Sequence, residues 1–348
     1  MRQLYNAVAI PKMTYAADVW YTPVNKRVGR LRSSSSVGIM GKLASLQWMA
    51  TLAITGALRS TATNTLDLHA DVLPVKFLLQ NICHRAILRM ASLPPSHPLH
   101  KPVLTRAKRY IMSHCSPLHE LAHIFGIAPQ DLETITPTSS LPNCQLKCKM
   151  VIHGSAEESE AYAMDCQSEL IIYSDGSGIG GRRGAATVLC KAGCSLKTLR
   201  LHLGSLEEHT TFKAEVASLS LALHLLSLKR NACSTTILLD NQAVIQSLEH
   251  RETRSAQYLL DELTHQIGTI YRQARHLDFE LCVAWVKGHV EIEGNELADA
   301  VAKAAAGGES SMASSLLRLL TSLLPVSITA QKQAFMASLH EQWGEAWR

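Results

Sequence analysis

Aromatic residues are scarce in this 348-residue sequence, because Phe, Trp and Tyr together make up only 5% of it. Hydrophobic residues still reach 47%, so a core would consist mainly of Leu, Ala, Ile and Val, and wholesale disorder is excluded. The sequence shows no N-terminal signal pattern, and we find no apolar run near 18 residues. We therefore expect a soluble, intracellular chain that has no membrane partner.

Cysteine does not follow the spacing of a disulfide framework or a zinc finger. The nine cysteines are scattered, and an odd number in an intracellular chain favours free thiols. Cys144 and Cys148 are four residues apart, as are Cys190 and Cys194, but neither pair has a second pair at zinc-finger spacing. A zinc site remains the weaker interpretation of these pairs.

Charge is divided unevenly along the chain, although the net charge is only +5. Residues 1–150 hold 17 Lys and Arg against 6 Asp and Glu, whereas residues 151–348 hold 17 against 23. A basic half indicates a polyanionic partner. An acidic half that handles a polyanion would need cations to mediate the contact.

Hydrophobic spacing divides the chain into four segments. Residues 1–125 read as a mainly helical basic segment, with helices expected near 42–58, 75–93 and, in part, 101–123. Residues 126–167 have little periodicity and are interpreted as a linker. The region 168–306 alternates strands and helices, and 307–348 is expected to form a helical tail with helices at 316–324 and 331–347.

The pattern from residue 168 to residue 306 predicts an α/β domain. Strands are expected at 170–174, 184–190, 196–203, 235–239 and 279–286, and helices at 211–229, 242–249, 255–275 and 294–306. This order combines a meander with strand–helix–strand units. It predicts a mixed five-stranded sheet flanked by helices.

Four acidic residues stand at informative places in this pattern. Asp175 and Asp240 end expected strands, Glu215 lies in the first turns of the long helix, and Asp299 lies in the last helix. Carboxylates beside apolar runs are costly unless they meet a cation, and ligands gather at the carboxyl ends of strands in such sheets. Together these acids would suit Mg²⁺, or Mn²⁺, although each alone could be a turn, cap or surface residue.

Four sequence segments carry a family resemblance that covers roughly 140 residues. Tyr-Ser-Asp-Gly-Ser, Phe-Lys-Ala-Glu, Leu-Asp-Asn-Gln and Trp-Val-Lys-Gly-His-Val-Glu-Ile-Glu-Gly-Asn-Glu-Leu-Ala-Asp contain Asp175, Glu215, Asp240 and Asp299 respectively. Segment by segment they resemble type 1 ribonuclease H, which implies an RNase H-like fold. The last segment is the most specific, because it holds His289 and Asp299 at the family's spacing.

The resemblance implies a site and a reaction. The four acids match the family's metal ligands, with two Mg²⁺ ions per site, and His289 matches its mobile histidine. The activity implied is hydrolysis of the RNA strand of RNA–DNA hybrids. Contacts to the hybrid are expected at Gly176, Ser177, Thr210, Thr211, Gln242 and Asn295. Glu291 departs from the family, in which Gly is common at that position, and no Lys/Arg-rich, Trp-bearing helix follows Asp240.

The first 120 residues resemble the region after the polymerase palm in reverse transcriptases of non-LTR, LINE-type retrotransposons of fungi. The match rests on Leu4-Tyr5, Pro11 to Tyr15, Trp20, and the segments 46–57 and 73–74. It implies a thumb and connection remnant whose partner is the missing reverse transcriptase portion. No Tyr-x-Asp-Asp pair is present, so we expect no DNA synthesis.

The leading hypothesis is a metal-dependent endoribonuclease from the C-terminal part of a retrotransposon polyprotein. Two alternatives stay open. One is a catalytically inactive nucleic-acid-binding remnant of a transposon. The other is a transposase or integrase of the same broad fold, which the acid Asp299 and the position of His289 disfavour.

Overall fold

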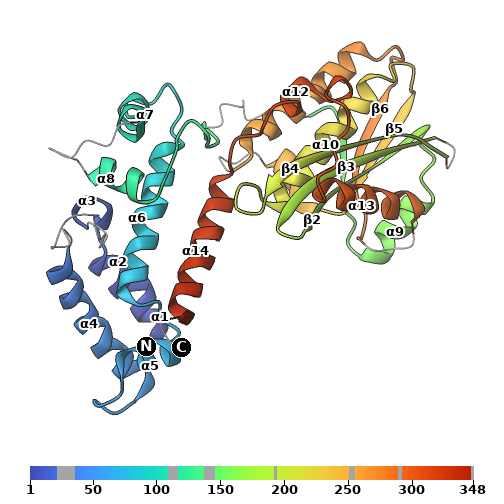
Figure 1. Cartoon of the computed structure of the whole chain (residues 1–348). Coiled ribbons are helices and arrows are strands. Elements are labelled where there is room, and N and C mark those ends of the chain that lie inside the picture. Colours follow the sequence, from blue (N-terminus) through green and yellow to red (C-terminus); the bar gives the residue numbers. More distant parts are fainter. Residues whose placement is uncertain are drawn as a thin grey trace. The chain divides into compact units, whose positions relative to one another are not determined.

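The structure is a computed structural model that describes residues 1–21, 36–108, 117–136, 146–191, 194–250, 255–288 and 292–345. The chain divides into two compact units, which we call the helical unit and the sheet unit. The helical unit comprises Met1–Leu132 and Lys332–Arg348, and the sheet unit comprises Glu133–Gln331 (Figure 1). The helical unit is basic, with 17 Lys and Arg against 7 Asp and Glu, and the sheet unit is acidic, with 17 against 22.

The described part of the helical unit is built from helices, as the sequence predicted. Its elements are α1 (Arg2–Leu4), a π-helical stretch η1 (Tyr5–Ala9), α2 (Ile10–Met13), α3 (Ala17–Trp20), α4 (Val37–Thr55), α5 (Thr63–Ala70), α6 (Val75–Ala91), α7 (His100–Lys108), α8 (Pro117–Ile124) and most of α14 (Ile328–Glu345). Helix α6 is the most deeply buried of these, with Leu79, Ile87 and Leu88 inaccessible to solvent. It begins after Pro74 and ends just before Pro94-Pro95, since proline interrupts a helix interior.

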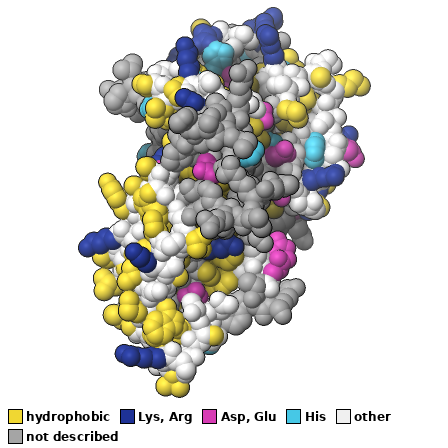
Figure 2. All heavy atoms as spheres, turned by 60° about the vertical axis from the view of Figure 1, so that its left-hand side comes forward, with side chains coloured by type: hydrophobic (Ala, Val, Ile, Leu, Met, Phe, Trp, Pro, Cys, Tyr) yellow, Lys and Arg dark blue, Asp and Glu magenta, His cyan; other side chains and the backbone are white. Residues whose placement is uncertain are grey.

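Helix α4 contradicts the expectation that no apolar run approaches 18 residues. Its 19 residues have a mean hydropathy of 1.3, and only 17% of the apolar window is buried. Val37, Ile39, Leu46 and Met49 are exposed on it, and Figure 2 shows many hydrophobic side chains at the surface. By length and composition α4 could cross a membrane, but a single helix of this kind is weak evidence for a span.

The sheet unit contains a six-stranded mixed sheet in the order β1-β6-β5-β2-β3-β4. Strands β2, β3 and β4 form an antiparallel meander, and β2, β5, β6 and β1 are parallel. The elements are β1 (Lys149–Val151), α9 (Ala156–Met164), β2 (Leu170–Ile179), β3 (Arg182–Lys191), β4 (Cys194–Ser205), α10 (Thr211–Ser227), β5 (Ser234–Leu239), α11 (Gln242–Glu249), α12 (Gln257–Gln273), β6 (Glu280–Trp285) and α13 (Glu293–Ala306). The predicted α/β class and its five strands are confirmed, and β1 adds a sixth.

Helices cover both faces of this sheet. Alternate residues of each strand point to opposite faces, so Ile172 and Ile237 join the core beneath α10 and α12, whereas Tyr173 and Leu238 join the core beneath α9 and α13. Leu219 and Leu223 of α10 are fully buried in the first of these cores. The Leu, Ala, Ile and Val expected from the composition supply most of both cores.

Two segments differ from the sequence prediction. The expected linker 126–167 contains α9 and β1, because β1 gains hydrogen bonds by pairing with β6 from Lys149↔Cys282 to Val151↔Ala284. The expected helix 316–324 is instead an irregular segment with a 3₁₀ turn, η3 (Arg318–Leu320). Its apolar spacing does not specify an α-helix, because Leu316, Leu320 and Leu324 reach the core from this irregular path.

A buried carboxylate joins distant parts of the sheet unit. Glu133 is only 1% exposed. Its carboxylate accepts hydrogen bonds from Ser255 Oγ, from Ala256 N at 2.8 Å and from Ile328 N at 2.8 Å. It thereby caps the start of α12 and the start of α14. Lys213 is fully buried nearby, donates to the Pro325 carbonyl, and interacts electrostatically with Glu133.

Candidate active site

Asp175 and Asp240 are brought together by the register of two parallel strands. Asp175 lies within β2, and Asp240 directly follows β5. Strand β2 pairs with β5 up to Ser174↔Leu239, so the next residue of each strand is an aspartate. The two aspartates therefore lie at neighbouring positions, although Asp175 does not end its strand as expected, since β2 continues to Ile179.

Glu215 reaches the same place because β2 and α10 approach very closely. A Cβ atom at Gly176 would lie 2.5 Å from the Glu215 backbone nitrogen and 2.8 Å from the carbonyl carbon of Ala214. Only glycine fits at that distance. Thr210 begins α10 as its N-cap, and its hydroxyl accepts a hydrogen bond from Lys213 N at 3.1 Å. The helix start and the glycine together fix where Glu215 points.

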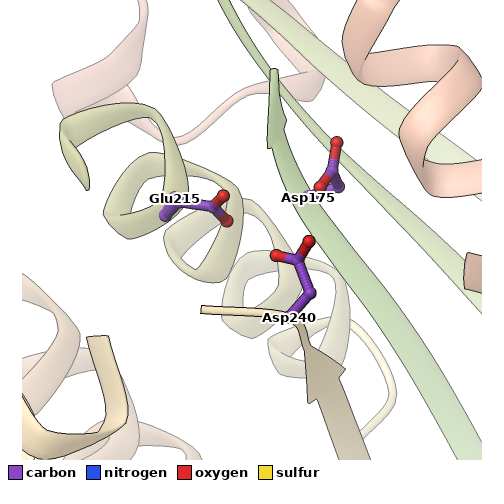
Figure 3. A group of neighbouring side chains, drawn as sticks. All are labelled: Asp175, Glu215 and Asp240. Atoms are coloured by element: carbon purple, nitrogen blue, oxygen red, sulfur yellow. The ribbon is translucent and has the colours of Figure 1, made fainter. Parts of the chain in front are cut away.

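The three carboxylates converge on one point (Figure 3). One oxygen each of Asp175, Glu215 and Asp240 lies within 4.8 Å of the others, which is close enough to hold a single metal ion. Asp175 and Glu215 are buried, and Asp240 is half-buried. All the donors are carboxylate oxygens, the set that suits a hard cation such as Mg²⁺ or Mn²⁺.

The cluster is electrostatically unbalanced as it stands. Asp175 Oδ2 and Glu215 Oε2 are buried and have no hydrogen-bond partner among the described residues. Burial, together with the charges of Asp240 and Asp299, raises the pKa of Asp175 to about 7. Burial, with Asp240 and Asp175 nearby, raises the pKa of Glu215 well above its ordinary value. Buried carboxylate oxygens without a partner are costly, so the residues fit a site for a divalent cation.

Asp299, the fourth predicted acid, lies close to this cluster but is engaged differently. It projects from α13 and forms an ion pair with Lys303 at 2.5 Å. Its charge raises the pKa of Asp175, which places it in the electrostatic neighbourhood of the three acids. Asp299 is not one of the three acids whose oxygens converge.

The other predicted site residues are distributed as follows. Gly176 and Ser177 lie on β2, Thr211 is exposed at the start of α10, and Gln242 is half-buried at the start of α11. Asn295 is 6% exposed within α13, which makes it a packed residue in this structure. His289 and Glu291 lie outside the described residues. The hybrid-binding roles of these residues stay predictions.

Three residues near the acids were missed by sequence reasoning. Trp285 donates from its indole nitrogen to the Asp240 carbonyl at 2.9 Å. A Cβ atom at Gly288 would lie 2.9 Å from Asp240 Oδ2, so this glycine leaves room for the carboxylate. Lys303 could have been found, because it stands four residues after Asp299 on a predicted helix.

Comparison with known families identifies the sheet unit. Residues 167–307 match the family model described as RNase H, and the chain therefore contains an RNase H domain over this range. The match covers the five predicted strands and all four predicted acids. A search of curated proteins finds no match.

Solved structures similar to this chain each match about 40% of it. RNase H1 from the archaeon Halobacterium salinarum is 19% identical, with a TM-score of 0.31, and the match spans 40% of this chain and 98% of that one. An N-terminal RNase H domain from Mycobacterium tuberculosis, solved as a fusion with maltose binding protein, is 23% identical, with a TM-score of 0.32 and coverage of 40% and 95%. LC11-RNase H1, solved in complex with an RNA/DNA hybrid, is 20% identical, with a TM-score of 0.32 and coverage of 40% and 96%.

Proposed function

We propose that this chain is a ribonuclease H, an endoribonuclease that hydrolyses the RNA strand of RNA–DNA hybrids inside the cell. The observation that carries the proposal is the convergence of Asp175, Glu215 and Asp240, with two buried oxygens left without partners, inside a domain that matches the RNase H family. A carboxylate cluster of this kind can handle a phosphodiester only if cations mediate between the two negative charges.

The cofactor proposed is Mg²⁺, with two ions per site, and Mn²⁺ as a substitute. Asp175, Glu215 and Asp240 would hold the first ion, and Asp175 with Asp299 would hold the second. When bound, such ions activate a water and stabilise the leaving 3′ oxygen of the RNA. Product ends would be 5′-phosphate and 3′-hydroxyl.

The chain's own residues would position the substrate and move protons. His289 would assist proton transfer or product release, because an imidazole changes charge near neutral pH. Gly176, Ser177, Thr210, Thr211, Gln242 and Asn295 are the proposed hybrid contacts. Selection of RNA would come from contacts to 2′-hydroxyl groups in the minor groove.

The basic helical unit is proposed to help hold the hybrid. Its 17 Lys and Arg against 7 acids would attract a polyanion that the acidic sheet unit repels. We further propose that the chain is the C-terminal part of a retrotransposon polyprotein and that its partner is the missing reverse transcriptase portion. The helical, basic character of residues 1–125 supports this proposal.

The proposal is tested with the full chain on a labelled RNA–DNA hybrid. We expect cleavage of the RNA strand that requires Mg²⁺ and that the substitution Asp175→Asn abolishes. Asp165→Asn, an exposed aspartate after α9, is the matched control and should cleave normally. Hybrid binding without cleavage in both Mg²⁺ and Mn²⁺ would instead support the inactive nucleic-acid-binding remnant.

A further inference from the structure

Three neighbouring hollows lie at the end of the sheet opposite the carboxylates. A cavity of about 680 Å³ opens at the first residues of β5 and β6, and one of about 340 Å³ opens beside Leu170 at the start of β2. A third hollow of about 10 Å³ adjoins both, since Phe279 also lines the first cavity and Lys229 and Arg230 also line the second. Strand β5 separates this end from Asp240 by about 20 Å, at 3.3 Å per residue.

The cavity of about 340 Å³ concentrates positive charge. Lys229, Arg230 and Arg275 line it, and none of the three side chains has an acidic partner among the described residues. The single acid in the lining, Glu169, is already neutralised by Lys191 at 2.8 Å. Cations gathered in one cavity repel each other, so the arrangement favours a bound anion.

The positions of Lys229, Arg230 and Arg275 at helix ends explain each cation separately. They do not explain why the three cations lie around one cavity. Lys229 and Arg230 follow α10, and Arg275 follows α12, and cations are stabilised near helix C-termini by the helix dipole. That effect explains a cation at either helix end separately. It does not explain why both ends deliver their cations to one cavity in a unit whose net charge is negative.

The larger cavity combines aromatic rings with two more cations. The half-buried Tyr162 and Tyr271 belong to its lining, and so do Lys147 and Lys149, whereas Phe279 behind them is only 7% exposed and belongs to the core. Both lysines are exposed on the segment that carries the edge strand β1. Rings beside cations are the combination on which unstacked bases and phosphates bind together.

Hydroxyl groups and an exposed leucine also line the larger cavity. Ser234 lines the cavity, where its Oγ accepts from Glu169 N at 3.0 Å and keeps its own proton to donate. Ser168 also lines it and is hydrogen-bonded to the buried Thr236 at 2.7 Å, and Leu277 at the rim is fully exposed. Hydroxyls can bond to sugar and phosphate oxygens, and an exposed leucine can pack against a base. The two cavities therefore offer apolar, hydrogen-bonding and cationic surface at the same end of the sheet.

We propose that this rim of the sheet unit binds single-stranded nucleic acid. Bases would pack against the Tyr162, Tyr271 and Leu277 wall, and phosphates would meet the lysines and arginines of both cavities. A single strand is favoured over a duplex because the base faces are free only when bases are unstacked. The inference concerns a surface distant from the carboxylate cluster, so it stands or falls separately from the proposed nuclease activity.

The first test measures binding of a fluorescein-labelled oligouridylate to the full chain by anisotropy, in EDTA, over a range of salt concentrations. Lys229→Gln with Arg230→Gln should weaken binding about tenfold at low salt and make the slope of log K against log salt shallower by about 1.4, at 0.7 per phosphate contact. The control pair, Lys197→Gln with Arg318→Gln, removes two exposed cations that line neither cavity and should leave the slope unchanged. Equal slopes in the parent and both variants would overturn the proposal.

The second test locates the bases. A 4-thiouridine-containing oligonucleotide should photocrosslink to peptides that hold Tyr162 or Tyr271, and Leu277→Asp should reduce the yield severalfold without lowering the melting temperature. Crosslinks confined to residues 1–132 would overturn the proposal. So would equal weakening of single-strand and hybrid-duplex binding by the Lys229 and Arg230 changes, or complete competition by inorganic phosphate, which would indicate an anion pocket only.

Discussion

The sheet unit buries carboxylates in two places, and the two places are treated in opposite ways. Glu133 is 1% exposed and accepts hydrogen bonds from Ser255, Ala256 and Ile328, with Lys213 as a nearby cation. Asp175 and Glu215 are 9% and 4% exposed, each leaves one buried oxygen unpaired, and each faces another acid. Burial is similar in the two places, and only the partners differ.

This difference separates structure from function. A buried carboxylate surrounded by donors stabilises the fold that supplies those donors. A buried carboxylate that has an unpaired oxygen and lies beside like charges costs stability that the rest of the fold must offset. The unpaired carboxylate oxygens of Asp175 and Glu215 therefore mark the place where a cation from solution is expected to bind. The contrast with Glu133 leads to the following predictions.

The largest expected effect is on activity when the unpaired cluster is changed. Asp175→Asn removes a metal ligand that is proposed to act in the transition state. Metal ions supply several kcal/mol of transition-state stabilisation, so hybrid cleavage should fall about a thousandfold or more. Initial rates on labelled hybrid measure this loss.

The same variant should keep or gain stability in EDTA, because it removes a charge from a repulsive cluster. Its thermal midpoint, compared with that of Asp165→Asn, checks this expectation. A large drop in the midpoint would show that Asp175 is a structural residue like Glu133, and the contrast would fail.

Truncation should have the next largest effect. A fragment that begins at residue 160 lacks Glu133 and β1, so the buried Lys213 loses one of the two acids that act on it and β6 loses one of its two neighbouring strands. We expect this fragment to be largely unfolded, whereas a fragment of residues 133–331 should fold cooperatively. Urea unfolding followed by circular dichroism distinguishes the two, and equal stability would contradict the role given to Glu133.

Replacing Glu133 alone should cost less than truncation but still several kcal/mol. Glu133→Ala leaves the amides of Ala256 and Ile328 unpaired and removes one of the two acids that act on the buried Lys213. Removing one partner of a buried charge costs about 3–5 kcal/mol. Chemical denaturation of the full chain measures the change. Glu215→Gln is the matched comparison, since it alters an equally buried acid and should be neutral or stabilising in EDTA.

The pH dependence of the melting temperature should also reveal the unpaired Asp175 carboxylate, with a smaller effect than the Glu133 substitution. Because the folded protein raises the pKa of Asp175 from 3.8 to about 7, the folded state holds that proton more tightly than the unfolded state. The stability contributed by the proton is therefore present below about pH 4 and is lost as the pH rises to about 7. In EDTA, the melting temperature of the parent should fall relative to that of Asp175→Asn across this window. Parallel curves would refute the assignment, and Mg²⁺ at pH 8 should close the gap.

The smallest effect is expected at Lys303. Its ion pair with Asp299 is partly exposed, with 45% of the lysine side chain accessible, and pairs of this kind contribute about 0–1 kcal/mol. Lys303→Met should therefore strengthen Mg²⁺ binding no more than about fivefold. Calorimetric titration of the full chain measures this change, and a hundredfold shift would mean that Lys303 blocks a cation position outright.

Much of the sheet unit could be predicted because its signals are local. The β-branched and apolar run before Asp240 predicts a strand, and the spacing of Phe212, Val216, Leu219 and Leu223 predicts the helix that carries Glu215. The short strand β1 was missed since three residues carry too little periodicity, and its pairing with β6 depends on a partner more than a hundred residues away. The apolar character of α4 was also missed, because Lys42 interrupts it.

The sequence by itself determined the order of strands and helices, the family of residues 167–307, and the identity of the acids, because spacing and motif are properties of neighbouring residues. Only the tertiary structure decided which acids share a point: Asp175, Glu215 and Asp240 converge, whereas Asp299 is paired with Lys303. It also decided that the Glu133 carboxylate accepts hydrogen bonds from Ala256 and Ile328, and that Lys229, Arg230 and Arg275 line one cavity at the end of the sheet opposite the acids. Those outcomes depend on contacts between distant residues, and burial and partner together set the energy of a charge.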